Sequence, residues 1–224
     1  MESPLKTQIL FHIGPIPVAD AVVTSWVIIV VIALTGFLST RRLRDTPGKW
    51  QSFIEILVVG INQQIRDIVQ QDPKPLLPLV GTLFLFLVFA NLSSLLPGVK
   101  APTATLETPA ALAVIVFFAV HVFGARTRGV WQHLKSYTEP RIFMLPFNIL
   151  SEITRTFALM IRLFGNMMSG QFMGAVVIAL AGLIVPIPFM ALDALIGLVQ
   201  AYIFAILATV FVGAAVAQQE PGKD

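Results

Sequence analysis

The sequence predicts an all-α membrane protein with about five membrane-embedded helices and one amphipathic helix at the cytoplasmic membrane surface. Two observations predict this class. Of the 224 residues, 56% are hydrophobic and 12% are charged, whereas soluble domains carry about 25% charged residues. Several stretches also reach or approach the roughly 18–20 apolar residues that span a bilayer. We therefore expect a single membrane domain over residues 1–224.

The predicted membrane helices follow one another along the whole chain. The first is uncharged and precedes an arginine cluster, the second and third are of ordinary length, and the last two are long. Their ranges are 21–38, 76–96, 109–125, 146–182 and 188–217. At about 1.5 Å per residue the fourth would measure about 55 Å, against a hydrocarbon core of about 30 Å. Internal breaks usually carry proline, so we favour a long tilted hairpin over broken helices.

An amphipathic helix is predicted over residues 50–71, between the first two spans. Its apolar positions recur at helical spacing, with charged and amide residues elsewhere. They are Phe53, Ile54, Leu57, Ile61, Ile65 and Ile68. Such a helix lies along the cytoplasmic interface, and the alternative is a soluble connector packed on protein.

Basic residues give the chain an orientation. They gather in two connections, at Arg41, Arg42, Arg44 and Lys49 and at Arg126, Arg128, Lys135 and Arg141. Because Lys and Arg favour cytoplasmic loops, we expect the N-terminus outside and the C-terminus inside. The same membrane pattern, rather than nucleic-acid binding, explains the net charge of +3. No cleavable signal peptide is evident, since the first apolar run precedes its positive cluster.

Several chemistries are excluded by composition. The absence of cysteine excludes disulfides and thiolate sites, and His12, His121 and His133 have no metal-ligand spacing. No GxxxxGK[ST] phosphate loop is present, so nucleotide hydrolysis has no basis in this chain. We predict neither a cofactor nor a metal site.

Residues 142–217 contain four charged side chains, Glu152, Arg155, Arg162 and Asp193. Each costs at least about 2.5–3.5 kcal/mol near the bilayer centre, so such residues line pathways or form pairs. Helical arithmetic places Arg162 mid-helix, at the depth of Gln200 on the next helix. Gln171 and Asp193 lie outward of that level, and Glu152 and Arg155 inward. This arrangement indicates two aqueous half-paths divided by a positive charge.

Arginine suits a dividing role because it stays charged when partly desolvated. It lowers the pKa of a carboxylate that approaches it and repels cations between the half-paths. The alternative is a structural pair of Arg162 with Asp193 or Glu152, but the helical rise separates both acids from it. The carboxylate that meets Arg162 is therefore expected on another subunit. The pairs Gly165/Ser169 and Gly170/Gly174 would permit close approach of another helix, although packing within the hairpin explains them equally well.

The run Arg162-Leu163-Phe164-Gly165-Asn166-Met167 resembles the a subunit of F-type ATP synthase. The similarity extends over 146–174, resumes at Leu198–Phe204 with a Gln-Ala-x-Ile-Phe pattern, and is weaker at Asn91–Pro97. The resemblance implies a stator beside a ring of c subunits, with b-type peripheral-stalk subunits and the rest of the enzyme as partners. It also implies a multi-pass protein of a bacterial inner membrane, surrounded by lipid.

The resemblance assigns ion translocation to five residues: Arg162, Asn166, Gln200, Asp193 and Gln171. Arg162 matches the essential arginine that faces the c-ring carboxylate. Gln171 and Asp193 occupy outer-path positions where relatives commonly carry Glu or His, so this chain departs there. Glu152, Arg155 and Asn148 are the inner half-channel candidates. The transported ion is H⁺ or Na⁺, because its ligands lie mainly on the c subunit.

Two other functions remain open from the residues alone. A self-contained channel or secondary transporter would carry ions without partners, and an internal repeat or broken helices would indicate it. A membrane scaffold would tolerate loss of Arg162 without loss of ion flux. The resemblance favours the stator over both.

Overall fold

The structure is a computed structural model that describes residues 9–13, 16–41, 48–69, 74–96, 99, 101–129, 144–181 and 186–217. Five of its helices are long and apolar enough to cross a membrane, which confirms the predicted class of all-α membrane protein. The basic residues Arg42, Arg44, Lys135 and Arg141, and the last seven residues, 218–224, lie outside the described parts.

A short β-hairpin precedes the helices, and the sequence analysis did not anticipate it. Strands β1 (Ile9–Ile13) and β2 (Ile16–Ala19) pair antiparallel, with Ile13 opposite Ile16 and Ile9 opposite Ala19. The first helix, α1 (Asp20–Thr40), follows β2 directly. The Asp20 carboxylate accepts a hydrogen bond from the Ala21 backbone N–H at 2.8 Å, which satisfies one free donor of the first turn.

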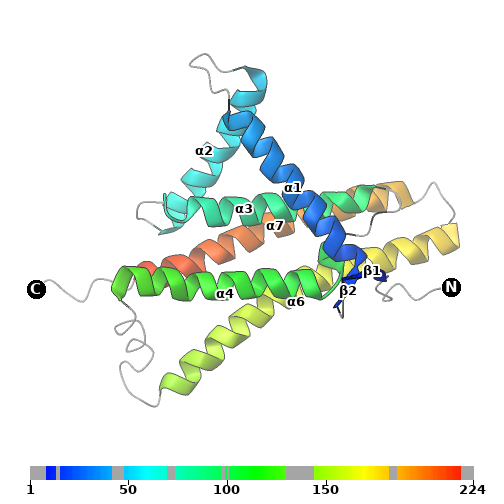
Figure 1. Cartoon of the computed structure of the whole chain (residues 1–224). Coiled ribbons are helices and arrows are strands. Elements are labelled where there is room, and N and C mark those ends of the chain that lie inside the picture. Colours follow the sequence, from blue (N-terminus) through cyan, green and yellow to red (C-terminus); the bar gives the residue numbers. More distant parts are fainter. Residues whose placement is uncertain are drawn as a thin grey trace, which may run out of the picture.

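The bundle is formed by α3 (Leu77–Leu92), α4 (Glu107–Arg128), α6 (Met144–Ala181) and α7 (Pro186–Ala217). Helices α3, α4 and α7 lie side by side, and α6 crosses them obliquely (Figure 1). One buried cluster joins all four helices. Its members are Leu83, Leu87, Leu112, Ala113, Val116, Leu159, Leu163, Ala201, Phe204 and Ala208.

The last two helices are continuous. Helix α6 has 38 residues and α7 has 32, which correspond to about 57 and 48 Å at about 1.5 Å per residue. They pack against each other as an antiparallel pair. Absence of a break within either described helix favours the tilted hairpin over the broken one. The connection at 182–185 lies outside the described residues.

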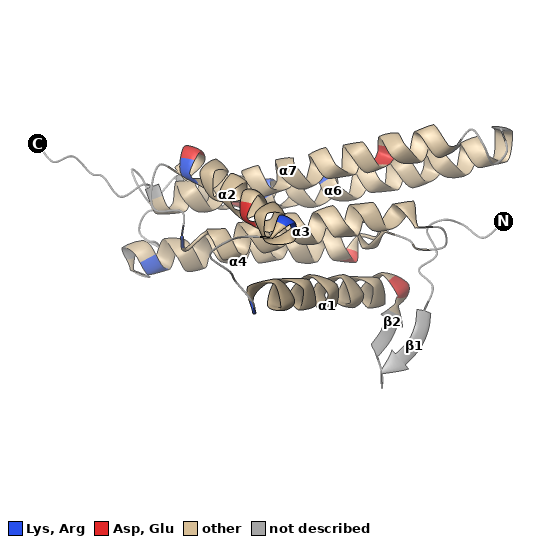
Figure 2. Ribbon diagram, turned by 90° about the horizontal axis from the view of Figure 1, so that it is seen from above, with Lys and Arg blue, Asp and Glu red and all other residues tan. Residues whose placement is uncertain are grey.

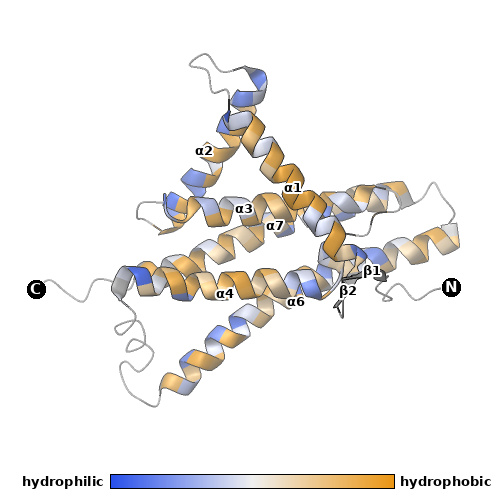
Figure 3. Cartoon of the chain, viewed as in Figure 1, coloured by the Kyte–Doolittle hydropathy of each residue, from blue (hydrophilic) through white to orange (hydrophobic). Residues whose placement is uncertain are grey.

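Helix α2 (Lys49–Val69) is amphipathic and packs on the bundle at one end only. Ile65 and Val69 are buried beside α3 and α7, whereas Trp50, Phe53 and Ile56 are exposed. Figure 3 shows hydrophilic segments toward both ends of α2, while α1 is hydrophobic over most of its length. One end of the helix is therefore packed on protein, as in the connector alternative, and the other end is exposed.

A buried polar junction joins α3 to α7. The Asn91 side-chain amide, 1% exposed, donates to the Gly197 carbonyl at 2.7 Å. Its Oδ1 accepts from the Thr103 hydroxyl of the short helix η2 (Pro102–Ala104) at 2.8 Å. A Cβ at Gly197 would lie 2.9 Å from the Asn91 Cβ, so only glycine allows this approach without displacement. The junction fixes the level of α7 against α3.

Candidate functional site

Contacts between α6 and α7 define their antiparallel register. The Asp193 carboxylate lies against Gly170, where a Cβ would collide with it. Further along, the Met167 side chain lies over Gly197, where a Cβ would be 2.8 Å from the Met167 Cε. At the other end, the Arg155 guanidinium carbon lies 5.6 Å from the centre of the Phe211 ring. Residue numbers thus rise along α7 as they fall along α6.

This register places Gln200 level with the turn of α6 that runs from Arg162 to Asn166. The neighbouring buried residues agree, because Leu163 and Ala201 belong to one cluster. The structure therefore places three residues at one level of the bundle: Arg162 and Gln200, whose common depth helical arithmetic predicted, and Asn166, which the resemblance added. The three residues come from two helices, α6 and α7.

Two side-chain amide nitrogens are buried at this level. The Asn166 Nδ2 and the Gln200 Nε2 have no hydrogen-bond partner among the described residues, and Gln200 is 7% exposed. Buried side-chain donors are nearly always paired with protein or water, and an orphan costs about 1–3 kcal/mol. A pair of such donors at one level is a feature that ion or water passage would explain.

Arg162 lies on the outer surface of α6. Leu159, Leu163 and Met167 form the buried line of this helix, with exposures of 2%, 0% and 1%. Arg162 precedes Leu163 by one residue, which rotates it by about 100° from that line, and it is exposed. Within the described ranges its guanidinium forms no ion pair with Asp193 or Glu152. The internal pair considered from the sequence is therefore absent there.

The exposed stripe around Arg162 is built from small residues. Ala158, Gly165 and Ser169 are exposed on the same side of α6. A Cβ at Gly165 or Gly174 would meet no atom within 4 Å, so neither glycine serves packing inside the described chain. Gly170 differs, because it accommodates Asp193 of α7. The Gly165/Ser169 pair thus lies on open surface, whereas in the Gly170/Gly174 pair only Gly170 makes an internal contact.

The outer candidates lie beside each other across the hairpin. Gln171 directly follows Gly170, which contacts Asp193, and both Gln171 and Asp193 are partly buried. In the described part of the chain the Asp193 carboxylate forms no salt bridge. It is therefore a carboxylate held by packing rather than by an opposite charge.

The inner candidates include a contact that sequence reasoning missed. The His121 Nδ1 on α4 lies 3.6 Å from a Glu152 carboxylate oxygen on α6, with side-chain exposures of 35% and 18%. The same Nδ1 is 2.9 Å from the Phe117 carbonyl oxygen. The sequence shows His121 as a polar residue inside an apolar span. Its partner Glu152 lies on another helix, α6, and sequence spacing does not show that the two side chains meet. The remaining inner candidates differ in exposure: Asn148 is partly buried and Arg155 is exposed.

Metal ligands do not gather in the described regions: no group there of three or more His, Asp or Glu side chains could hold a metal ion. The site consists instead of two permanent cations, Arg162 and Arg155, together with side-chain amides and separated carboxylates. Such a set can pass a proton or small cation along a path but offers no nucleophile held beside a base.

Comparison with known proteins identifies the family. The sequence model of the family described as ATP synthase A chain matches residues 22–213. The chain is 58% identical over 220 residues to "ATP synthase subunit a 2" of Bradyrhizobium sp. strain BTAi1, covering 98% of this chain and 99% of that one. It is 46% identical over 214 residues to "ATP synthase subunit a 2" of Pelobacter propionicus, covering 96% and 94%. The chain therefore belongs to the ATP synthase A chain family, the non-catalytic, ion-translocating membrane subunit of F-type ATP synthase.

Proposed function

We propose that this chain is the stator that supplies two ion half-channels and presents Arg162 to the carboxylates of a rotating c-ring. In this proposal an ion enters near Asp193 and Gln171, loads a c-subunit carboxylate, and leaves near Glu152 after most of a rotation. Asn166 and Gln200 line the level at which the carboxylate passes Arg162. Peripheral-stalk subunits of the b type would hold the chain against the ring.

The exposure of Arg162 carries this proposal. An arginine facing lipid at mid-helix costs at least about 2.5–3.5 kcal/mol, and it stays protonated throughout. No described residue pairs with it, and Ala158 and Gly165 leave room beside it. A partner helix that brings a carboxylate to this stripe would remove the cost.

The proposed half-channels follow from polar groups at both ends of the hairpin. Asp193 and Gln171 lie about 10 and 13 Å from the Arg162 level at about 1.5 Å per residue, and Glu152 lies about 15 Å away in the other direction. Arg155 and Asn148 accompany Glu152 on α6. The Arg162 charge between the two groups would oppose direct passage of cations. Each charge that crosses contributes about 2.3 kcal/mol per 100 mV.

The charge distribution supports an orientation in a bacterial inner membrane. Helices α1 and α4 begin with Asp20 and Glu107, and Arg41 and Arg126 lie at their other ends. Figure 2 shows acidic residues where α1 and α4 begin and basic residues where α4 ends. The positive-inside rule then puts the basic ends in the cytoplasm, the N-terminus outside and the C-terminus inside.

The test is ion-driven ATP synthesis in bacterial membranes that carry Arg162→Ala in the assembled complex. We expect loss of synthesis, whereas Arg126→Ala, which removes an exposed arginine at the end of α4, should retain it. Normal synthesis with Arg162→Ala would contradict the proposal. Ion flux through the purified chain alone in liposomes would instead favour a self-contained channel or transporter. Synthesis by wild type in Na⁺-free buffer distinguishes H⁺ from Na⁺.

A further inference from the structure

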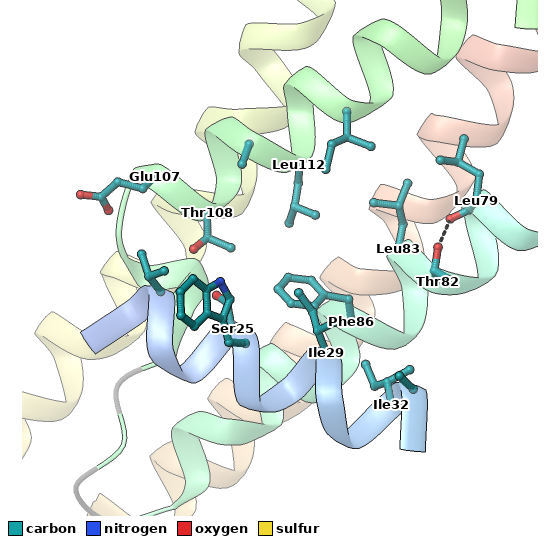
Figure 4. A pocket seen from close by; sticks show the side chains of 15 residues that line it. Ser25, Ile29, Ile32, Leu79, Thr82, Leu83, Phe86, Glu107, Thr108 and Leu112 are labelled. Carbon is teal, nitrogen blue, oxygen red and sulfur yellow. Dashed lines mark hydrogen bonds between the residues drawn. The ribbon is translucent and has the colours of Figure 1, made fainter. Parts of the chain in front are cut away.

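A cavity of about 600 Å³ lies between α1, α3 and α4 (Figure 4). The cavity exists because α1 packs against the bundle only along its first half. The buried residues of α1 are Ala21 and Ile28. Beyond them the helix separates from α3 and α4. The wall of the cavity is mostly aliphatic and aromatic, with Leu83, Phe86 and Leu112 on the bundle side.

Three polar side chains lie at one end of this cavity. Glu107 and Thr108 come from the first turn of α4, and Trp26 from the second turn of α1. None of the three side chains has a hydrogen bond or ion pair among the described residues. At the opposite end, the Thr82 hydroxyl already has a hydrogen-bond acceptor, because it donates to the Pro78 carbonyl at 2.7 Å. The cavity is therefore apolar along its length and polar at one mouth.

We propose that this cavity binds an acyl chain of an ethanolamine phospholipid, with its headgroup at Glu107, Thr108 and Trp26. All three walls come from helices long and apolar enough to cross a membrane, so the cavity would lie at the depth of the bilayer hydrocarbon. Glu107 and Thr108 begin α4 and therefore lie near headgroup level, where tryptophan is also enriched in membrane proteins. From Thr108 to Ile115 the cavity extends about 10 Å at about 1.5 Å per residue, which suits the upper part of one chain.

The headgroup follows from charge complementarity. The Glu107 carboxylate attracts the ammonium of ethanolamine and repels a lipid of net negative charge. The Thr108 hydroxyl and the Trp26 indole N–H are donors, which the phosphate and ester oxygens can accept. A zwitterionic lipid with an amine satisfies all three groups, whereas a glycerol headgroup leaves the carboxylate without a cation.

The first experiment is native mass spectrometry of the purified full-length chain with equal amounts of phosphatidylethanolamine and phosphatidylglycerol. We expect one strongly retained ethanolamine lipid. Glu107→Gln should weaken its retention about tenfold, the loss of roughly one charge-assisted hydrogen bond. Asp20→Asn is the control, because Asp20 also begins a helix but does not line the cavity. Equal retention of both lipids, or no response to Glu107→Gln, would overturn the proposal.

Filling the cavity gives an independent measurement. Ala33→Phe adds a ring inside the lining, and Leu34→Phe adds one to the neighbouring exposed position outside it. Only Ala33→Phe should release the lipid. In the assembled complex, a photo-crosslinking residue at Ala111, which lines the cavity, should yield lipid adducts. A cross-link to another polypeptide would show that a protein helix occupies this face and would overturn the proposal.

Discussion

Replacing Gly170 by alanine tests whether contact with α6 positions the outer carboxylate. A Cβ at Gly170 would collide with the Oδ1, Cγ and Oδ2 atoms of Asp193. These atoms end a short side chain, so the carboxylate can rotate away while both helices stay in place. A strained rotamer costs about 0.5–1.5 kcal/mol, and replacing an interior helical glycine by alanine gains about 0.5–1 kcal/mol. The free energy of unfolding should therefore change by less than about 1 kcal/mol.

Ion-driven ATP synthesis should respond more than stability does. A catalytic or transport group displaced by about 1 Å can lose up to about a hundredfold in rate, and we expect about a tenfold loss for Gly170→Ala. The matched control is Gly174→Ala, one turn further along α6, where a Cβ meets nothing within 4 Å. The assay compares the two variants in the same membranes, with thermal unfolding measured in parallel. Equal synthesis by both variants would refute a positioning role for the contact.

Three further predictions concern stability. Gly197→Ala should lower the free energy of unfolding in detergent by about 1–2 kcal/mol, because overpacking against the Asn91 Cβ costs more than alanine gains in helix propensity. The control Gly81→Ala, which has open space around the new Cβ, should not destabilise the chain. Asn91→Ala should cost about 1–3 kcal/mol by leaving the buried Thr103 hydroxyl without its acceptor, and an unchanged melting temperature would contradict this. A double-mutant cycle of His121→Gln and Glu152→Gln should give a coupling energy below about 1 kcal/mol, since both side chains are partly exposed. A coupling energy above about 2 kcal/mol would contradict this expectation.

The helices were predictable because hydropathy and period are local properties. An uncharged stretch such as 21–38 requires a membrane helix whatever surrounds it, and the depth of Gln200 followed from helical rise alone. The hairpin of β1 and β2 was not anticipated, since two strands of five and four residues carry little periodic signal. Short strands are the elements for which pairing, rather than pattern, decides the structure.

The contacts between helices were less predictable. Asn91 and Gly197 are separated by 106 residues along the chain, and their hydrogen bond depends on the rotation of both helices about their axes. The contact of His121 with Glu152 likewise depends on how α6 crosses α4. Sequence spacing gives the depth of a side chain and leaves its direction undetermined until the packed face of the helix is known.

The packed face of α6 gives a reason for proposing that the partner of Arg162 lies outside the described chain. Leu159, Leu163 and Met167 succeed one another every four residues and pack into the bundle. Turning Arg162 inward would require rotating α6 by about 100° and withdrawing this line from its contacts. Even then, Glu152 and Asp193 would lie at least about 10 Å away along the helices. Since the guanidinium does not lose its proton, we expect the compensating carboxylate or water to come from whatever covers the exposed stripe.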